Sequence, residues 1–227
     1  MRYGPGMRVW MLALVATLAA ECTRAPSEDF PSRSAPLGTS PAPAAASAVV
    51  APVEGPSPAG SGRCMLTTPE KAPAAVAPGP APGCPVDPEG GPPKVPVVHV
   101  AFPDARPPVL TTHPSTAVEA ELVSSSHDTE RGLMYRKSMP EDRGMLFDLR
   151  VRDEHPFWMH NTCIPLDLIH IDDDGVIVGI LENAPTLNDA PRTVGCPSRY
   201  VLEVNAGWSR RHGVKAGQHM SIPPEAR

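Results

Sequence analysis

The chain has 227 residues and a formal net charge of −5, and its lysines and arginines are scattered along it with no more than two in succession. A chain without a basic stripe is not drawn onto a phosphate backbone, so we expect no nucleic-acid partner. Most of the 31 prolines precede residue 115. A segment so rich in proline and alanine cannot bury enough apolar surface to offset the entropy of ordering it. The sequence therefore predicts one compact domain in the C-terminal half.

Residues 1–22 have the pattern of an export signal. Arg2 and Arg8 precede the apolar run VWMLALVATLAA, which suits the apolar core of a signal peptide and is too short for a free-standing membrane span. Cys22 follows, and residues 18–22 resemble a bacterial lipoprotein cleavage box, except that Glu21 stands where such boxes have a small residue. We expect either a lipid anchor on Cys22, which would tie the chain to a membrane, or ordinary cleavage that yields a periplasmic or secreted protein.

Residues 23–114 are predicted to be a disordered spacer. Their composition favours extended, polyproline-like conformers that would hold a domain away from a membrane or wall. The apolar piece VPVVHVAF at 95–102 could form a strand, but Pro96 and Pro103 limit it to a sheet edge or a tether. We place this piece outside the domain.

The domain itself is expected over residues 115–223. Alternating or apolar runs predict strands at 117–123, 157–161, 166–171, 176–181, 199–204 and within 214–222. Asp174-Gly175 accepts the positive φ angles of a tight turn and predicts a hairpin. One short helix can be capped by Ser126 or Asp128, and a second by Asn205. The pattern predicts a mainly-β fold, either a small β-sandwich or a partly open barrel, with two short helices.

Five cysteines fit an oxidising compartment, in which disulfides form. If Cys22 carries lipid, four remain, and sequence position favours local pairing. Cys163 and Cys196 both lie at strand margins of the folded part, so we predict a disulfide between them. Cys64 and Cys84 bracket a proline-rich loop of the spacer.

No metal or cofactor is expected. The cysteines are not spaced as C-x-x-C, and the histidines do not form a ligand pattern such as H-E-x-x-H. The acidic stretch at 172–174 lacks the first and twelfth ligands of an EF-hand and is interpreted as a solvated hairpin tip.

Two carboxylates stand out on otherwise apolar strand faces. Asp167 shares its face with Ile169 and Ile171, and Glu203 shares its face with Val201. A buried carboxylate needs a hydrogen-bond donor or a raised pKa, because an unpaired buried charge is costly. Adding the nearby polar and aromatic side chains gives a candidate binding pocket of Trp158, Asn161, Thr162, Asp167, Glu203 and Arg136.

Three functions remain open at this point. The first is a non-catalytic binding or interaction module for a small molecule, a glycan or an envelope protein. The second is a hydrolase on envelope polysaccharide or peptide that uses Asp167 and Glu203 as its two acids. The third is a structural envelope component, in which both acids only satisfy backbone amides or pair with arginine. No catalytic residue can be assigned.

Three longer motifs carry a resemblance to a known family: GLMYRKSMPEDRGMLFDL, FWMHNTCIPLDLIHIDDDGVIVGI and RYVLEVNAGWSRRHGVKAGQ. In order and spacing they resemble the uncharacterised family called domain of unknown function number 192, including its Trp-Met-x-Asn-Thr-x-Ile-Pro-Leu-Asp signature at Trp158 to Asp167. The resemblance implies a small mainly-β domain, often exported and sometimes lipid-anchored, without an established activity.

Overall fold

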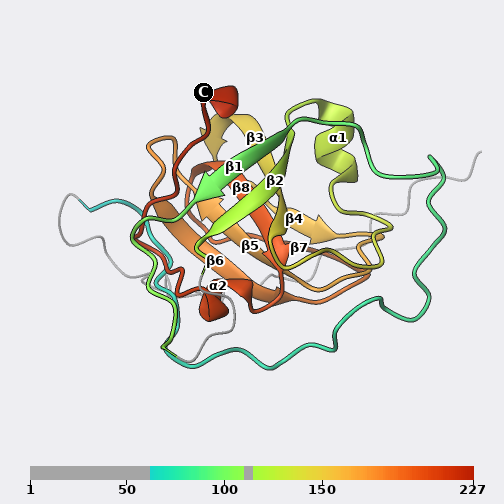
Figure 1. Cartoon of the computed structure of the whole chain (residues 1–227), viewed down its shortest axis with the longest axis horizontal. Helices are drawn as coiled ribbons and strands as arrows, with labels where there is room; N and C mark the ends of the chain where they lie inside the picture. Colours follow the sequence, from blue (N-terminus) through green and yellow to red (C-terminus); the bar gives the residue numbers. More distant parts are fainter. Residues whose placement is uncertain (1–61, 110–114) are drawn as a thin grey trace, which may run out of the picture. The chain divides into compact units, whose positions relative to one another are not determined.

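The computed structural model describes residues 62–109 and 115–227 (Figure 1). The signal segment, the cleavage box at Cys22 and the first part of the predicted spacer lie outside these residues. No described residue belongs to a helix long and apolar enough to cross a membrane. The elements follow one another as β1 (Val97–Ala101), β2 (Ala117–Val123), α1 (Ser126–Arg131), β3 (Arg143–Asp153), β4 (Phe157–Met159), β5 (Leu166–Ile171), β6 (Ile177–Ala184), β7 (Asn188–Arg192), β8 (Ser198–Asn205), α2 (Trp208–Arg211) and a 3-10 turn (Pro224–Ala226).

Six strands form one sheet in the order β1-β2-β3-β8-β5-β6. Only β2 and β3 run parallel, and the other neighbours are antiparallel. Strands β4 and β7 form a separate two-stranded sheet. The predicted mainly-β class with two short helices is confirmed, and the large sheet is open rather than closed into a barrel.

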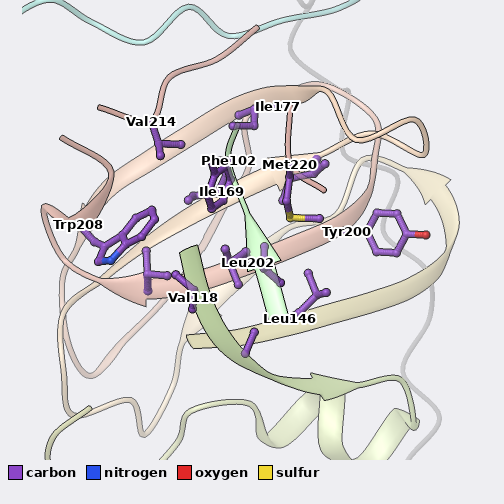
Figure 2. Close-up of a cluster of buried hydrophobic side chains, with 14 of the residues drawn as sticks. Phe102, Val118, Leu146, Ile169, Ile177, Tyr200, Leu202, Trp208, Val214 and Met220 are labelled. Atoms are coloured by element: carbon purple, nitrogen blue, oxygen red, sulfur yellow. The ribbon is translucent and has the colours of Figure 1, made fainter. Parts of the chain in front are cut away.

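The large sheet is buried on both faces, and each face has its own core. Side chains alternate between the faces with a period of two residues, so each central strand contributes to both cores. One core, the Trp208 face, is drawn in Figure 2 and includes Phe102, Val118, Leu146, Ile169, Leu202 and Trp208. The other, the Phe147 face, includes Leu133, Met145, Phe147, Met159, Leu168 and Val201.

The expected domain boundary at residue 115 is wrong, because the segment before it is built into the sheet. Strand β1 pairs with β2 in the register Val97↔Glu121, and Val98 and Val100 are buried in the Trp208 face. As its flanking prolines suggested, β1 is an edge strand. Further upstream, the Leu66 amide donates to the Val178 carbonyl at 2.7 Å. A few apolar and hydrogen-bonding residues are thus enough to attach this proline-rich segment to the sheet.

The predicted Cys163–Cys196 disulfide is also wrong. Cys196 pairs with Cys64 at a Cα–Cα distance of 5.5 Å, and Cys163 pairs with Cys84 at 5.4 Å. The prediction assumed that the two N-terminal cysteines were remote from the domain, whereas the segment that holds them lies on its surface. Two disulfides indicate an oxidising environment, as in extracellular or periplasmic space.

Several local predictions need correction. Strand β3 was not predicted as a strand, and α1 is capped by Ser125 rather than by Ser126 or Asp128. Residues 214–222 do not form a strand and contribute one isolated bridge, Val176↔His219. Residues 188–192 form β7 despite Pro191, because β7 is half of a two-stranded ribbon and lacks a neighbour on one side. Asn205 does not cap α2, since its side chain donates to the carbonyls of Met139 and Pro140.

Candidate functional site

The two candidate acids lie on opposite faces of the large sheet. In the pairing of β5 with β8, Asp167 is opposite Val204 and Leu168 is opposite Glu203. Directly opposed residues share a face, so Asp167 belongs to the Trp208 face and Glu203 to the Phe147 face. A sheet therefore separates the two carboxyl groups, and they cannot act together on one bond. The hydrolase hypothesis based on this pair is wrong.

Asp167 stabilises the fold. Its side chain is fully buried, and one carboxylate oxygen accepts hydrogen bonds from the amides of Asn183 and Gly207, both at 2.9 Å. The other oxygen accepts from the Ser209 amide at 3.0 Å. These amides include the free N–H groups at the start of α2, which a carboxylate satisfies well. Asp167 thus replaces the predicted local cap and ties α2 to strand β6.

Arg136 lines neither part of the groove. Its guanidinium makes two bonds of 2.6 Å to the Glu121 carboxylate, and its side chain is 16% exposed. Its positive charge lowers the pKa of Glu203, although burial has the larger and opposite effect.

The remaining four candidates line one groove on the Phe147 side of the sheet. The groove has two adjoining parts: an inner compartment of about 270 Å³ and an outer compartment of about 350 Å³. The predicted residues Thr162 and Glu203 line the inner compartment, and Asn161 lines the outer one. Trp158 lines both, as do the neighbouring residues of α1 and of the turn after it, which are Glu130, Arg131 and Met134.

Glu203 is one of the buried polar side chains that line the inner compartment, with Thr162 and Arg131. It lies on the central strand β8 between Met145 of β3 and Leu168 of β5, both fully buried, and is itself 5% exposed. Burial raises the pKa of Glu203 to about 8, against the opposing charge of Arg136. At neutral pH the group is therefore mostly a neutral carboxylic acid, which can donate one hydrogen bond and accept others.

The walls of the inner compartment are largely apolar. Leu133 is brought in by the turn that follows α1, and the rings of Phe147 and Phe157 meet edge to face with centroids 5.1 Å apart. Trp158 stands at the junction of the two compartments and is 46% exposed, and its ring centroid lies 5.1 Å from that of His160. The indole is thus a large aromatic surface that stays partly open to solvent in a small domain.

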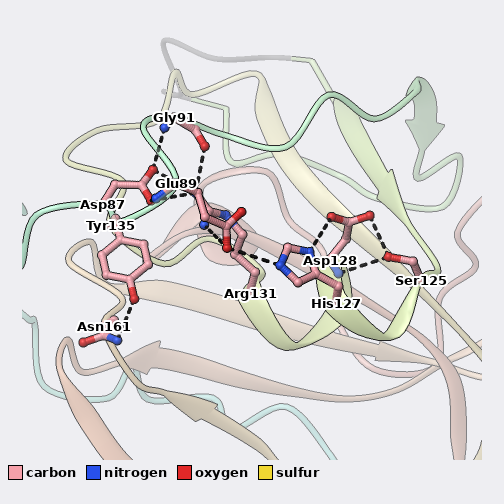
Figure 3. A network of polar contacts seen from close by, with 9 residues as sticks. All are labelled: Asp87, Glu89, Gly91, Ser125, His127, Asp128, Arg131, Tyr135 and Asn161. Carbon is pink, nitrogen blue, oxygen red and sulfur yellow. Dashed lines mark hydrogen bonds and ion pairs between the residues drawn. The ribbon is translucent and has the colours of Figure 1, made fainter.

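The outer compartment is bordered by a polar network that links α1 to the segment 87–91 (Figure 3). The buried Arg131 donates to both carboxylate oxygens of Asp87 at 2.8 Å and to the Gly91 carbonyl at 2.7 Å. It also pairs with Glu89 at 2.8 Å, and Glu89 in turn contacts His127 at 3.2 Å. The network fixes Glu89 at the border of the outer compartment.

Tyr135 and Asn161 both line the outer compartment, contact each other and have an unusual backbone conformation. Their φ angles are 65° and 51°, in the left-handed region that side chains other than glycine rarely adopt. The Tyr135 amide donates to the Asn161 carbonyl at 2.8 Å, and the Asn161 side-chain amide donates to the Tyr135 hydroxyl at 3.0 Å. Strained residues of this kind gather at binding sites because the surrounding structure must hold them in place.

The polar border of the outer compartment was missed at the sequence level. Asp87 and Glu89 lie in the segment taken as spacer, so their contact with Arg131 could not be foreseen. The available signal was the stretch DPEGG at 87–91, whose aspartate and glycines form a turn within proline- and alanine-rich sequence.

The expectation of a solvated hairpin tip at 172–174 holds for Asp173 and Asp174, which are exposed, but not for Asp172. Asp172 is buried, and both Arg63 and Arg152 bond to its carboxylate. Arg63 also pairs with Asp174. Since two arginines balance these charges, the tip stabilises the attachment of the N-terminal segment.

The chain belongs to the family DUF192 (Uncharacterized ACR), whose model matches residues 109–222. A solved structure from Sinorhizobium meliloti 1021, described as that of a candidate transcription regulator, is 34% identical, with 58% of this chain and 97% of that chain covered and a TM-score of 0.50. A protein of unknown function from Novosphingobium aromaticivorans DSM 12444 is 30% identical, with 65% and 94% covered and a TM-score of 0.50. No curated protein matches the chain.

The family match covers the residues that line the inner compartment but only part of the outer compartment and its border. Trp158, Asn161, Thr162 and Glu203 all lie within the family region, whereas Asp87 and its neighbours precede it. The inner compartment is thus made of family residues, and this chain adds part of the outer border from its own N-terminal segment.

Proposed function

We propose that this DUF192 domain is a non-catalytic binding module whose inner compartment takes a small uncharged group. The observation that carries the proposal is the position of Glu203, a buried side chain that lines a largely apolar compartment and has no hydrogen-bond partner among the described residues. Among the described residues no side chain or backbone group forms a hydrogen bond with this carboxyl, which lines the compartment and can therefore bond to a ligand or to water there. A ligand that presents a carbonyl or hydroxyl oxygen would supply the missing partner.

The apolar walls support a ligand with an apolar body and one polar end. Pockets for small molecules typically combine aromatic and aliphatic walls with a few polar groups that fix orientation. Phe147, Phe157 and Trp158 provide such walls, and Glu203 and Thr162 provide the polar groups. The second acid named from the sequence, Asp167, is on the other face of the sheet, so binding is favoured over catalysis by paired acids.

The proposal can be tested with three probes of similar size and different charge: benzamide, benzoate and benzylammonium. Binding to the full chain would be followed through the indole N–H NMR signal of Trp158, assigned by its loss in Trp158→Phe. Near pH 6 we expect benzamide to bind most tightly of the three probes. Glu203→Leu should weaken benzamide binding by about tenfold, because the hydrogen bond between Glu203 and the benzamide carbonyl is lost. Above about pH 8 the ionised Glu203 should favour benzylammonium instead.

Two outcomes would contradict this proposal. One is the absence of any Trp158 response to all three probes at millimolar concentration. The other is equal benzamide binding by the unmodified chain and by Glu203→Leu. The variant Glu203→Gln keeps the size of the side chain and a donor, so retained benzamide binding in this variant would separate hydrogen bonding from charge.

We further propose that the module is exported and that Cys22 carries a lipid. Support comes from the signal-like pattern of residues 1–22 and from two disulfides that need an oxidising compartment. Cys22→Ser should move the protein from the membrane fraction to the soluble fraction of cells. Unchanged fractionation would contradict the lipid anchor.

A further inference from the structure

We infer that the ligand of the groove is a neutral N-acetylated sugar, with its acetamido group in the inner compartment and its ring against Trp158. This inference rests on the proposed binding function and names the ligand class. Three features support it: the charges that line the groove, the half-exposed indole of Trp158 between its two compartments, and the polar groups of the outer compartment that can still form hydrogen bonds.

The charges that line the groove disfavour a charged ligand. Arg131 is its one arginine, and its guanidinium is already engaged by Asp87, Glu89 and the Gly91 carbonyl. A phosphate or carboxylate would have to compete with these two acids. A cation is also poorly matched to the inner compartment, because Glu203 is uncharged there at neutral pH. The groove therefore suits a molecule that is polar without carrying charge.

The inner compartment matches an acetamido group. Its carbonyl oxygen can accept the proton of the Glu203 carboxylic acid, which has no partner among the described residues. Its methyl group can pack against Phe147 and Phe157. A hydroxyl group in the same place would satisfy Glu203 but leave the apolar walls without contact, so the N-acetylated sugar is favoured over its simple hydroxylated counterpart.

Trp158 matches the ring of the same sugar. It borders both compartments, so a ring attached to a group in the inner compartment would lie over or beside the half-exposed indole. The C–H face of a sugar ring is apolar and packs against an aromatic face, while the ring's hydroxyl groups remain directed to its edge.

The outer compartment offers partners for those hydroxyl groups. Because the Asn161 side-chain amide donates to the Tyr135 hydroxyl oxygen, the hydroxyl proton of Tyr135 and the side-chain carbonyl oxygen of Asn161 remain available. One donates and the other accepts, which suits hydroxyl groups because they do both. The left-handed backbone at both residues holds this pair in place.

The test compares tri-N-acetylchitotriose with cellotriose, which has the same β-1,4-linked rings but no acetamido groups. Titration of the full chain would be followed by the Trp158 indole N–H signal. We expect the N-acetylated trimer to bind at least about tenfold more tightly. Equal binding of the two trimers, or tighter binding of cellotriose, would overturn the inference.

Variants of the outer compartment separate this inference from the proposed function. Tyr135→Phe removes only a hydroxyl, and Asn161→Gly removes the side chain while tolerating the left-handed backbone. Each should weaken binding of the trimer by about fivefold and weaken benzamide binding in the inner compartment by a smaller factor. Val97→Thr, at an exposed position on β1 that lines neither compartment, is the matched control and should change neither affinity.

The outcomes distinguish the two proposals. Benzamide binding without a response to the N-acetylated trimer would overturn the sugar inference and leave the binding function standing. Failure of both probes would overturn both. Trimer binding that is unaffected by Tyr135→Phe and Asn161→Gly would show that the sugar does not occupy the outer compartment, which also overturns the inference.

Discussion

Asp167 and Glu203 are both buried carboxyl groups on neighbouring strands, one on each face of the same sheet, and their surroundings differ completely. Asp167 accepts three backbone hydrogen bonds from Asn183, Gly207 and Ser209. Glu203 accepts none from the described residues, and its pKa is raised to about 8. The contrast teaches that burial of an acid does not indicate its role. The three backbone hydrogen bonds of Asp167 indicate a structural acid, and the lack of such bonds at Glu203 is the basis of the proposed binding function.

The largest expected effect comes from disrupting the hydrogen bonds that Asp167 accepts. Asp167→Asn replaces one accepting oxygen with an amide that cannot accept from the backbone N–H groups it faces. We expect the free energy of unfolding to fall by about 3–5 kcal/mol, because buried donors are left unpaired. Urea denaturation monitored by circular dichroism would measure it, with Glu225→Gln on the exposed C-terminal turn as a control. A loss below about 1 kcal/mol would contradict the structural role.

The next largest effect concerns the N-terminal segment that borders the outer compartment of the groove. The double variant Cys84→Ser with Cys163→Ser opens the loop that holds Asp87 and Glu89 near Arg131. The Cys84–Cys163 disulfide joins cysteines that are 79 residues apart in the sequence. Its removal should therefore lower the free energy of unfolding by about 2–4 kcal/mol. The N-acetylated trimer should also bind more weakly, whereas benzamide should be affected less. A variant as stable as the unmodified chain under oxidising conditions would refute the prediction.

The smallest expected effect has the opposite sign. Glu203→Leu removes an unpaired buried acid and should raise the free energy of unfolding by about 1–2 kcal/mol near pH 7. If Glu203 were a structural acid like Asp167, Asp167→Asn and Glu203→Leu would both lower the free energy of unfolding.

The same variant predicts a pH dependence. The folded pKa of Glu203 is about 8 and its ordinary value is 4.5, so between these values the folded chain holds a proton that the unfolded chain has released. The contribution of this group to stability is therefore fully present below about pH 4.5 and is lost as the pH rises to about 8. The stability difference between Glu203→Leu and the unmodified chain should widen over this window, by at most about 1.4 kcal/mol per pH unit. A constant difference would argue against the raised pKa.

Part of the fold could be predicted because several strands have clear patterns, although the central strand β3 was not among the predicted ones. The expected strands at 117–123 and 166–171 coincide with β2 and β5. The attachment of the N-terminal segment could not be predicted, since its anchors, such as Leu66, Arg63 and the two cysteines, are single residues in proline-rich sequence. A composition argument averages over such residues, whereas the structure depends on each of them.

The site was predicted in part for a related reason. Period-two alternation shows which residues of one strand share a face, but it does not show how the faces of two strands combine. That depends on register, which placed Leu168 rather than Asp167 beside Glu203. The cap of α2 was missed in the same way, because its carboxylate comes from a strand some 40 residues earlier in the chain. Local sequence identifies candidate groups, and long-range pairing decides which of them meet.

The nested arrangement of the two disulfides bears on the fate of the chain when a protease cuts it. Cys64 is joined to Cys196, and Cys84 to Cys163, so every peptide bond between residues 64 and 196 lies inside at least one covalent ring. A single cut anywhere in that range leaves the two fragments joined through sulfur, and they separate only on reduction. Whatever holds the N-terminal end of this protein in place would therefore keep hold of strand β8, and with it Glu203, after the backbone has been nicked.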